Sequence, residues 1–170
     1  AFDNLTIYDR HKRMMGLMDI PQWYLPGNHD LNFESPNALF ANETYKHHFG
    51  PTYYSFDEGS IHFVALNNVE YAGVEDSSRA GNYRGFISAR QLDWLKNDLE
   101  SVPTNKLIVI ATHIPLLATV DDGKSRPITG PGTENFTELI EILNSFENIY
   151  GIAGHDSSNS FKVEINHNHG

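Results

Sequence analysis

The sequence predicts an α/β domain, because apolar runs of strand length alternate with amphipathic helical patterns. Residues 107–111 and 149–153 are apolar runs rich in β-branched side chains, which is typical of strands buried on both faces. A helical pattern precedes each run, and Ser88 and Asn135 mark the two helix starts. The chain is long enough for one domain with a sizeable core and short for two, so residues 1–170 are predicted to form a single domain.

Local patterns predict the other elements in chain order. A helix runs from the N-cap Asn4 to about Met18, with its apolar side chains on one broad face. A strand over residues 21–26 follows, and the polar region after it contains a short helix near residues 38–45. The remaining expected elements are a hairpin at 53–57 and 60–66, exposed loops at 72–86 and 118–133, and a final strand at 161–165.

Composition and charge exclude several classes of protein. The formal net charge of −10 leaves no basic stripe to neutralise phosphates, so binding to nucleic acid or to an anionic membrane is not expected. The sequence contains no signal-peptide pattern and no apolar run long enough for a membrane span. The absence of cysteine excludes disulfides and thiolate metal sites. The chain begins at Ala1 without an initiator methionine, so we expect it to be a piece of a longer protein.

Three of the expected strands are followed within two or three residues by a histidine, namely His29, His113 and His155. In open α/β sheets, ligands gather outside the carboxyl ends of the strands, so the three imidazoles are expected to converge on one site. Asn28 and Asp30 flank the first histidine and add oxygen atoms that hard metal ions accept. Taken alone, this first stretch reads equally well as a polar loop with a capping aspartate. The recurrence after three strands favours a site.

Two weaker candidates lie elsewhere in the chain. The neighbouring pair His47 and His48 has the composition of a metal site, but adjacent residues of a helix or strand face different ways, which favours solvated side chains. Arg79 and Arg84 are candidate clamps for a phosphate or carboxylate group, and two ordinary surface arginines are the favoured alternative.

The motifs together resemble the last three of the five sequence blocks of the calcineurin-like metallophosphoesterases. They are, in order, the segments 27–30 (Gly-Asn-His-Asp), 112–115 (Thr-His-Ile-Pro) and 154–155 (Gly-His). The order and the strand contexts match, and the linking segments are similar to those of bacterial members of the family. The resemblance implies an α/β fold of the αββα sandwich type, with two metal ions at the strand ends.

The resemblance also implies a role for each site residue. Asn28, His113 and His155 would bind one of the two metal ions. His29 would bind no metal and would act as general acid near the leaving group, oriented by Asp30. The implied activity is that of a hydrolase of small phosphate mono- or diesters, in which a water is activated by two divalent or trivalent metal ions, most readily Mn, Fe or Zn.

The sequence departs from the family pattern at the other metal. The Asp-x-His and Gly-Asp blocks have no counterpart here, so we expect a domain incomplete at its N-terminus, with those ligands upstream of Ala1 and Asp3 as a supporting residue. The last block reads Gly154-His155-Asp156 where the family has Gly-His-x-His, and Asp156 is a substitute oxygen ligand at most. The chain as given is therefore expected to bind metal weakly and to show little or no activity.

Two other functions stay open at this stage. If no further metal ligands lie upstream, the chain is a non-catalytic remnant whose sheet serves binding. A nuclease with the same chemistry is disfavoured, because the chain is acidic and lacks interleaved aromatic and basic residues.

Overall fold

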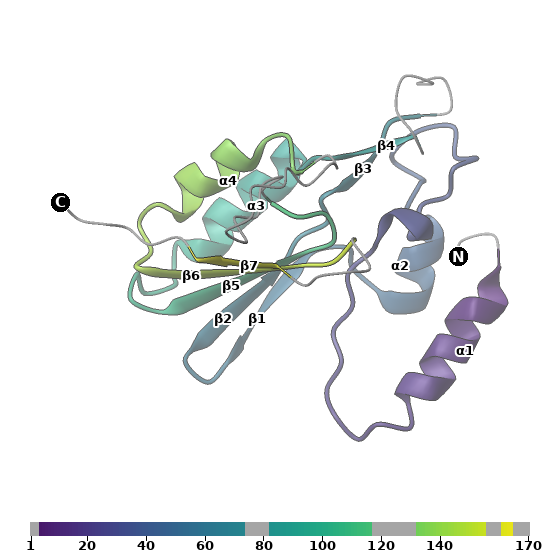
Figure 1. Cartoon of the computed structure of the whole chain (residues 1–170), viewed down its shortest axis with the longest axis horizontal. Helices are drawn as coiled ribbons and strands as arrows, with labels where there is room; N and C mark the ends of the chain where they lie inside the picture. The colour runs from purple at the N-terminus through teal and green to yellow at the C-terminus, as the bar shows by residue number, and fades with distance from the viewer. Residues whose placement is uncertain (1–3, 74–81, 117–131, 156–160, 165–170) are drawn as a thin grey trace, which may run out of the picture.

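The computed structural model describes the chain in four stretches, residues 4–73, 82–116, 132–155 and 161–164. Their main element is a five-stranded mixed sheet with the strand order β1-β2-β5-β6-β7 (Figure 1). The strands β2, β5 and β6 run parallel at its centre, and an antiparallel strand lies at each edge. The bounds are Tyr54–Glu58 (β1), Ile61–Ala65 (β2), Leu107–Thr112 (β5), Asn148–Ala153 (β6) and Phe161–Glu164 (β7).

Two helices cover one face of this sheet, α3 (Ala89–Leu99) and α4 (Phe136–Leu143), as Figure 1 shows. The core lies between these helices and the sheet, where Leu95, Leu139 and Ile110 have no exposed surface. The helix α4 belongs to the crossover that a parallel pair such as β5 and β6 requires. The predicted α/β class is thus confirmed. Of the αββα sandwich that the resemblance implies, the described residues form this five-stranded sheet and the helical layer on it.

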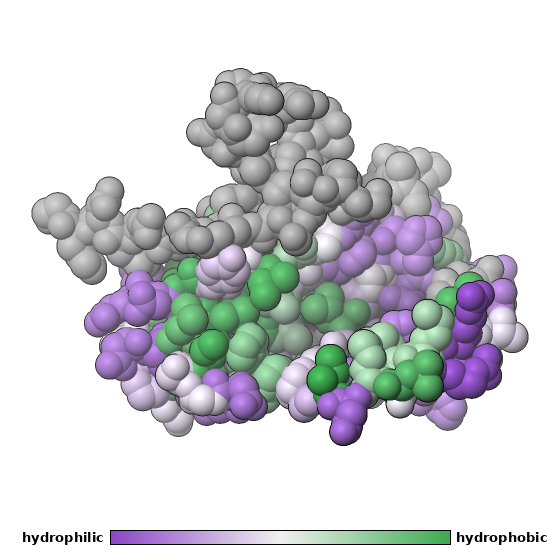
Figure 2. Space-filling model, turned by 60° about the horizontal axis from the view of Figure 1, so that its bottom comes forward, coloured by the Kyte–Doolittle hydropathy of each residue, from purple (hydrophilic) through white to green (hydrophobic). Residues whose placement is uncertain are grey.

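Apolar side chains gather on the face of the sheet opposite these helices (Figure 2). The ring of Trp23 is 51% exposed and stacks on Phe56, with the ring centroids 4.4 Å apart. Phe56 also stacks on Phe63 of the neighbouring strand at 5.0 Å. Further along this face, Ile152 is 44% exposed. Within the described stretches, a stack of aromatic rings therefore covers the β1–β2 end of the face.

The predicted hairpin is confirmed, since β1 and β2 pair antiparallel across a turn at Gly59, whose φ of 58° suits a glycine. A two-stranded ribbon follows it, formed by β3 (Val69–Tyr71) and β4 (Tyr83–Gly85). The prediction of a loop throughout 72–86 is therefore corrected at β4, because a strand of three residues is too short to show a period-2 pattern. Most of both predicted loops lies outside the described residues, at 74–81 and 117–131.

The N-terminal part of the chain forms two helices beside the sheet, α1 (Leu5–Met15) and α2 (Glu43–Phe49) (Figure 1). They contact each other through aromatic rings, with Tyr8 edge-on to Phe49 at 5.1 Å between centroids. The predicted first helix is confirmed, although it ends before Met18. No helix in the described stretches is both long enough and apolar enough to span a membrane.

The helix predicted near residues 38–45 begins only at Glu43. Before it, Oδ1 of Asn37 accepts a hydrogen bond from the N–H of Leu39, and Oγ of Ser35 donates one to the carbonyl oxygen of Asn37. Such local side-chain bonds compete with helical backbone pairing, so the chain turns through this stretch before the helix starts.

The strand predicted at 21–26 is wrong, because these residues have no ladder partner among the described strands. Pro21 and Pro26 lack the backbone N–H groups that a strand uses for ladder bonds. A side chain of β1 holds the segment instead, since the hydroxyl of Tyr54 donates to the carbonyl oxygen of Tyr24 at 2.8 Å. The segment still carries the chain to the turn at residue 27.

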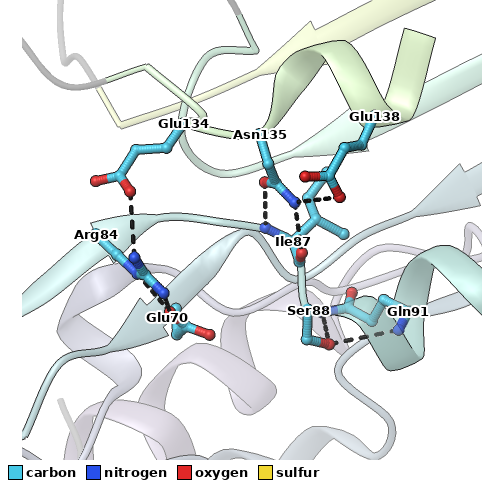
Figure 3. Close-up of polar contacts among 8 residues, drawn as sticks. All are labelled: Glu70, Arg84, Ile87, Ser88, Gln91, Glu134, Asn135 and Glu138. Atoms are coloured by element: carbon cyan, nitrogen blue, oxygen red, sulfur yellow. Dashed lines mark hydrogen bonds and ion pairs between the residues drawn. The ribbon is translucent and has the colours of Figure 1, made fainter. Parts of the chain in front are cut away.

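A polar cluster ties the β3–β4 ribbon to the start of α4 (Figure 3). Arg84 forms ion pairs with Glu70 and with Glu134, the second at 3.3 Å, and its guanidinium lies over the ring of Phe86. Two carboxylates thus neutralise this arginine, which favours the structural alternative over a phosphate clamp. The other candidate, Arg79, lies outside the described residues.

Asparagine and serine side chains fix the starts of the two core helices (Figure 3). Oγ of Ser88 accepts the N–H of Gln91, which confirms the predicted cap of α3. Asn135 stands at the start of α4 as predicted, but its amide bonds across to Ile87, accepting from N–H at 3.0 Å and donating to the carbonyl oxygen at 2.8 Å. This amide therefore joins the start of α4 to the chain before α3.

A buried histidine joins the hairpin to α3. Nδ1 of His62 lies 2.8 Å from Oδ1 of Asp57, and Nε2 lies 3.0 Å from Oδ2 of Asp98. The ammonium group of Lys106 lies 2.8 Å from the same oxygen of Asp57. Hydrogen bonds from Lys106 first, and from His62 second, lower the pKa of the Asp57 carboxyl below its ordinary value.

We expect the Asp57→Asn substitution to destabilise the protein at about pH 6 and to have a smaller effect at about pH 3. A carboxyl whose pKa is lowered by folding stabilises the folded state above its unfolded-state pKa, and this contribution is lost as the pH falls through the folded-state value. Chemical denaturation at both pH values measures the free energy of unfolding. The Asp93→Asn variant is the control, because Asp93 pairs with Lys96 only at 3.9 Å on the surface. An equal penalty for Asp57→Asn at both pH values would contradict the assignment.

Candidate metal-binding site

A single turn of 3-10 helix, Asn28–Asp30, carries the first group of site residues. The side chain of Asp30 closes the turn, because its Oδ2 accepts the N–H of Gly27 at 2.8 Å. The backbone N–H of Asp30 donates to the carbonyl oxygen of the same glycine at 3.1 Å. Within this turn Asn28 is buried, whereas the side chain of His29 is exposed.

The three residues predicted to share a metal meet at one point. Nε2 of His113 lies 2.9 Å from Oδ1 of Asn28 and 3.0 Å from Nδ1 of His155. His113 is 85 residues from Asn28 and 42 residues from His155 along the chain. The structure thus brings together the side chains that the sequence hypothesis placed around one ion.

The neighbouring ends of β5 and β6 place the two histidines. Thr112 lies opposite Ala153 in the parallel register, so the residues that follow leave the sheet side by side. The N–H of Gly154 donates to the carbonyl oxygen of His113 at 3.0 Å and ties the two loops together. His155 then adopts a φ of 71°, a left-handed conformation that few residues other than glycine take. Such strain is typical of functional sites, where surrounding contacts hold the residue in place.

Asn68, between β2 and β3, holds the loop that carries His113, and the sequence patterns did not reveal this role. It is fully buried, and its Oδ1 accepts the backbone N–H groups of both His113 and Ile114 at 3.1 Å. Its Nδ2 donates to the carbonyl oxygen of Ile114 and to Oγ1 of Thr133. Every donor and acceptor position of the amide is thereby used. The one signal in the sequence is the pair Asn67 and Asn68, which follows the predicted strand at 60–66.

Tyr83 of β4 approaches the far side of the His155 ring, with its hydroxyl oxygen 3.5 Å from Nε2. Burial raises the pKa of Tyr83 above its ordinary value, so the hydroxyl stays protonated. This contact helps to orient the His155 ring, and when Nε2–H donates to the hydroxyl oxygen the Nδ1 lone pair faces His113. The sequence placed Tyr83 in an exposed loop expected to face substrate, and its role beside the histidine depends on the ribbon.

The imidazole of His113 is neutral at physiological pH. Burial first, and the neighbouring ring of His155 second, lower the pKa of His113 to about 4, while the charge of Asp30 acts in the opposite direction. Its lone pair is therefore available without prior loss of a proton. Asn28 adds an amide oxygen, which carries no proton at all.

This donor set fits one metal ion. Two imidazole nitrogens and an amide oxygen suit divalent transition metals such as Mn, Fe and Zn. The part of the chain that the structure describes holds no group of three histidine, cysteine, aspartate or glutamate side chains that could bind a metal. In this site the third donor is an asparagine, and any further ligands must come from other residues or from solvent.

We call Asn28, His113 and His155 the trio. The other residues that the sequence analysis named lie beside the trio or outside the described stretches. Oδ1 of Asp30 accepts a hydrogen bond from the hydroxyl of Tyr8 at 2.8 Å. The ring of His48 packs against Tyr8 at 5.1 Å, so His48 belongs to the contact between α1 and α2. The proposed supporting residue and the substitute ligand both fall on undescribed positions, Asp3 and Asp156.

No family model matches the chain, but three curated proteins are similar to it. It is 28% identical over 142 residues to a 3′,5′-cyclic-nucleotide phosphodiesterase of Nostoc sp., which covers 84% of this chain and 46% of the relative. It is 27% identical over 153 residues to a probable glycerophosphodiester phosphodiesterase of Arcobacter nitrofigilis, covering 87% and 50%. Purple acid phosphatase 15 of Arabidopsis thaliana is 32% identical over 94 residues, covering 49% and 15%. The chain spans about half the length of the first two relatives.

A methyl group at Gly27 should disturb the trio, because this glycine lies against the ring of His113. A Cβ on Gly27 would lie 2.9 Å from Cε1 of that ring, so the ring would have to turn away from Asn28 and His155. We expect Gly27→Ala to lower the free energy of unfolding by about 1–3 kcal/mol. The NMR resonances of both histidine rings should shift as well.

The Gly154→Ala variant is the matched control, since its Cβ would meet His113 no closer than 3.8 Å, an ordinary contact. Urea denaturation and histidine ring spectra compare the two variants with the wild type. A Gly27→Ala protein with wild-type stability and unshifted rings would contradict the close packing at this glycine.

Proposed function

The chain belongs to the calcineurin-like metallophosphoesterases, and we propose from this premise that its protein is a metal-dependent hydrolase of small phosphate mono- or diesters. The observation that carries the proposal is the meeting of Asn28, His113 and His155 at one point. Packing alone does not require side chains that can bind a metal to converge from three separate segments. A shared cation accounts for their convergence.

We assign Oδ1 of Asn28 and the facing ring nitrogens of His113 and His155 to one of two metal ions, either Mn, Fe or Zn. The second ion would take its ligands from residues beyond the described ones. When bound, the two ions supply a water nucleophile active near neutral pH and stabilise the charge on the phosphate oxygens.

His29 is the proposed general acid. Its side chain is exposed in the same turn that holds the buried Asn28, so it can reach a substrate bound at the trio. It would donate a proton to the leaving-group oxygen as the bond from phosphorus to that oxygen breaks. Asp30 would place it through the backbone, because its carboxylate closes the turn onto Gly27.

Small phosphate diesters are the first substrate class to test. Two relatives that align with 84% and 87% of this chain are named as phosphodiesterases, and the third is named as a phosphatase. A nucleic acid is a poor alternative, since the net charge of −10 would repel its backbone.

Metal removal and return should test the proposal directly. Chelation should abolish hydrolysis of bis-(p-nitrophenyl) phosphate and p-nitrophenyl phosphate, and Mn²⁺ or Zn²⁺ should restore it. The His29→Ala substitution should lower turnover by about 10²–10⁴-fold with metal content nearly unchanged. The His113→Ala substitution should remove metal and activity together, because it deletes the central member of the trio.

The His47→Ala variant serves as the control, since its side chain is exposed on α2. Metal content is measured by atomic absorption and turnover by nitrophenolate release. Together they separate the proton transfer assigned to His29 from the metal binding assigned to His113. Wild-type rates in both the His29 and the His113 variants would show that the assignment is wrong.

A further inference from the structure

A tyrosine of α1 reaches the turn that presents Asn28 and His29. We propose that Tyr8 is a positioning residue of the site, whose hydroxyl holds Asp30 and thereby fixes this turn. The inference rests on the proposed function, which assigns Asn28 to a metal ion and His29 to proton transfer.

Each oxygen of the Asp30 carboxylate accepts a hydrogen bond from a different part of the chain. Its Oδ1 accepts the hydroxyl of Tyr8 at 2.8 Å, and its Oδ2 accepts the N–H of Gly27 at 2.8 Å. A rigid planar group therefore links α1 to the residue that opens the turn. Hydrogen bonds to an ionised acceptor are roughly twice as strong as neutral ones, so both contacts hold the carboxylate firmly.

The ring of Tyr8 is fixed by contacts with side chains of α2. Its side chain is 4% exposed, and its ring lies edge-on to Phe49 and tilted against His48, each with 5.1 Å between centroids. The ring therefore has little freedom to move the hydroxyl away from Asp30. Burial, and then the bond to Asp30, raise the pKa of Tyr8 above its ordinary value, so its hydroxyl remains a donor.

The alternative is that this bond merely attaches α1 to the rest of the molecule. In that case its loss would weaken the whole fold and would not act on the turn in particular. A positioning role predicts instead a local change at Gly27, the other partner of the Asp30 carboxylate. Removing the hydroxyl while keeping the ring separates these two readings.

Tyr45 of α2 provides a matched control. It is also buried, at 2% exposure, and its hydroxyl has no hydrogen-bond partner among the described residues. The Tyr45→Phe substitution therefore removes a buried hydroxyl from the same pair of helices without breaking a bond. Loss of such an unpaired group is neutral or stabilising.

The test compares Tyr8→Phe, Tyr45→Phe and the wild-type protein by amide hydrogen exchange and steady-state kinetics. In Tyr8→Phe, the N–H of Gly27 should exchange about tenfold faster, while amides in β5 keep their wild-type rates. Its kcat should fall about tenfold with KM within about twofold, since Tyr8 touches no substrate and acts on the placement of His29. The Tyr45→Phe variant should match the wild type in both measurements.

Unchanged exchange at Gly27 in Tyr8→Phe overturns the inference, and so does faster exchange with an unchanged kcat. Equal acceleration in β5 and at Gly27 also overturns it, because the effect is then a general loosening of the fold. A wild-type protein without phosphoesterase activity contradicts the proposed function itself. The exchange of Gly27 then still decides whether Tyr8 fixes the turn.

Discussion

Nε2 of His113 touches two other atoms with lone pairs, Oδ1 of Asn28 and Nδ1 of His155, and the rest of the site is arranged around this contact. Such atoms repel one another at 2.9 and 3.0 Å unless a proton or a cation lies between them. The pKa of His113, lowered to about 4, keeps its ring neutral at neutral pH, so this ring carries a single N–H for the two contacts. Under the proposed function, a metal ion would take the place of these hydrogen bonds, and the fold brings its proposed ligands together beforehand.

Each member of the trio is supported from a different part of the fold. The buried amide of Asn68 holds the backbone at His113, and Tyr83 stands behind the ring of His155. The turn that contains Asn28 is closed by Asp30, which α1 holds in its place. Outer partners of this kind fix the orientation and tautomer of metal ligands. The adjacent carboxyl ends of β5 and β6 make the two histidines neighbours in the first place.

Asn28 joins the trio although the residues before it, 21–26, form no strand. The two histidines were predictable from the sequence because a parallel sheet brings the carboxyl ends of its strands to one edge. A histidine just after a buried strand is therefore located by the strand itself. The supporting residues were not predictable. Tyr8 and Asn68 act across 22 and 45 residues of sequence, through contacts that no local periodicity encodes. The prediction of a strand at 21–26 was wrong for the same reason, since strand pairing depends on a partner strand and not on apolar composition alone.

A crystal structure of the protein grown with Mn²⁺, with anomalous data recorded at the manganese edge, tests the central claim most directly. We expect an anomalous peak in contact with Oδ1 of Asn28 and with the ring nitrogens of His113 and His155 that face each other. A peak that touches none or only one of the three, or no peak at saturating Mn²⁺, would contradict it.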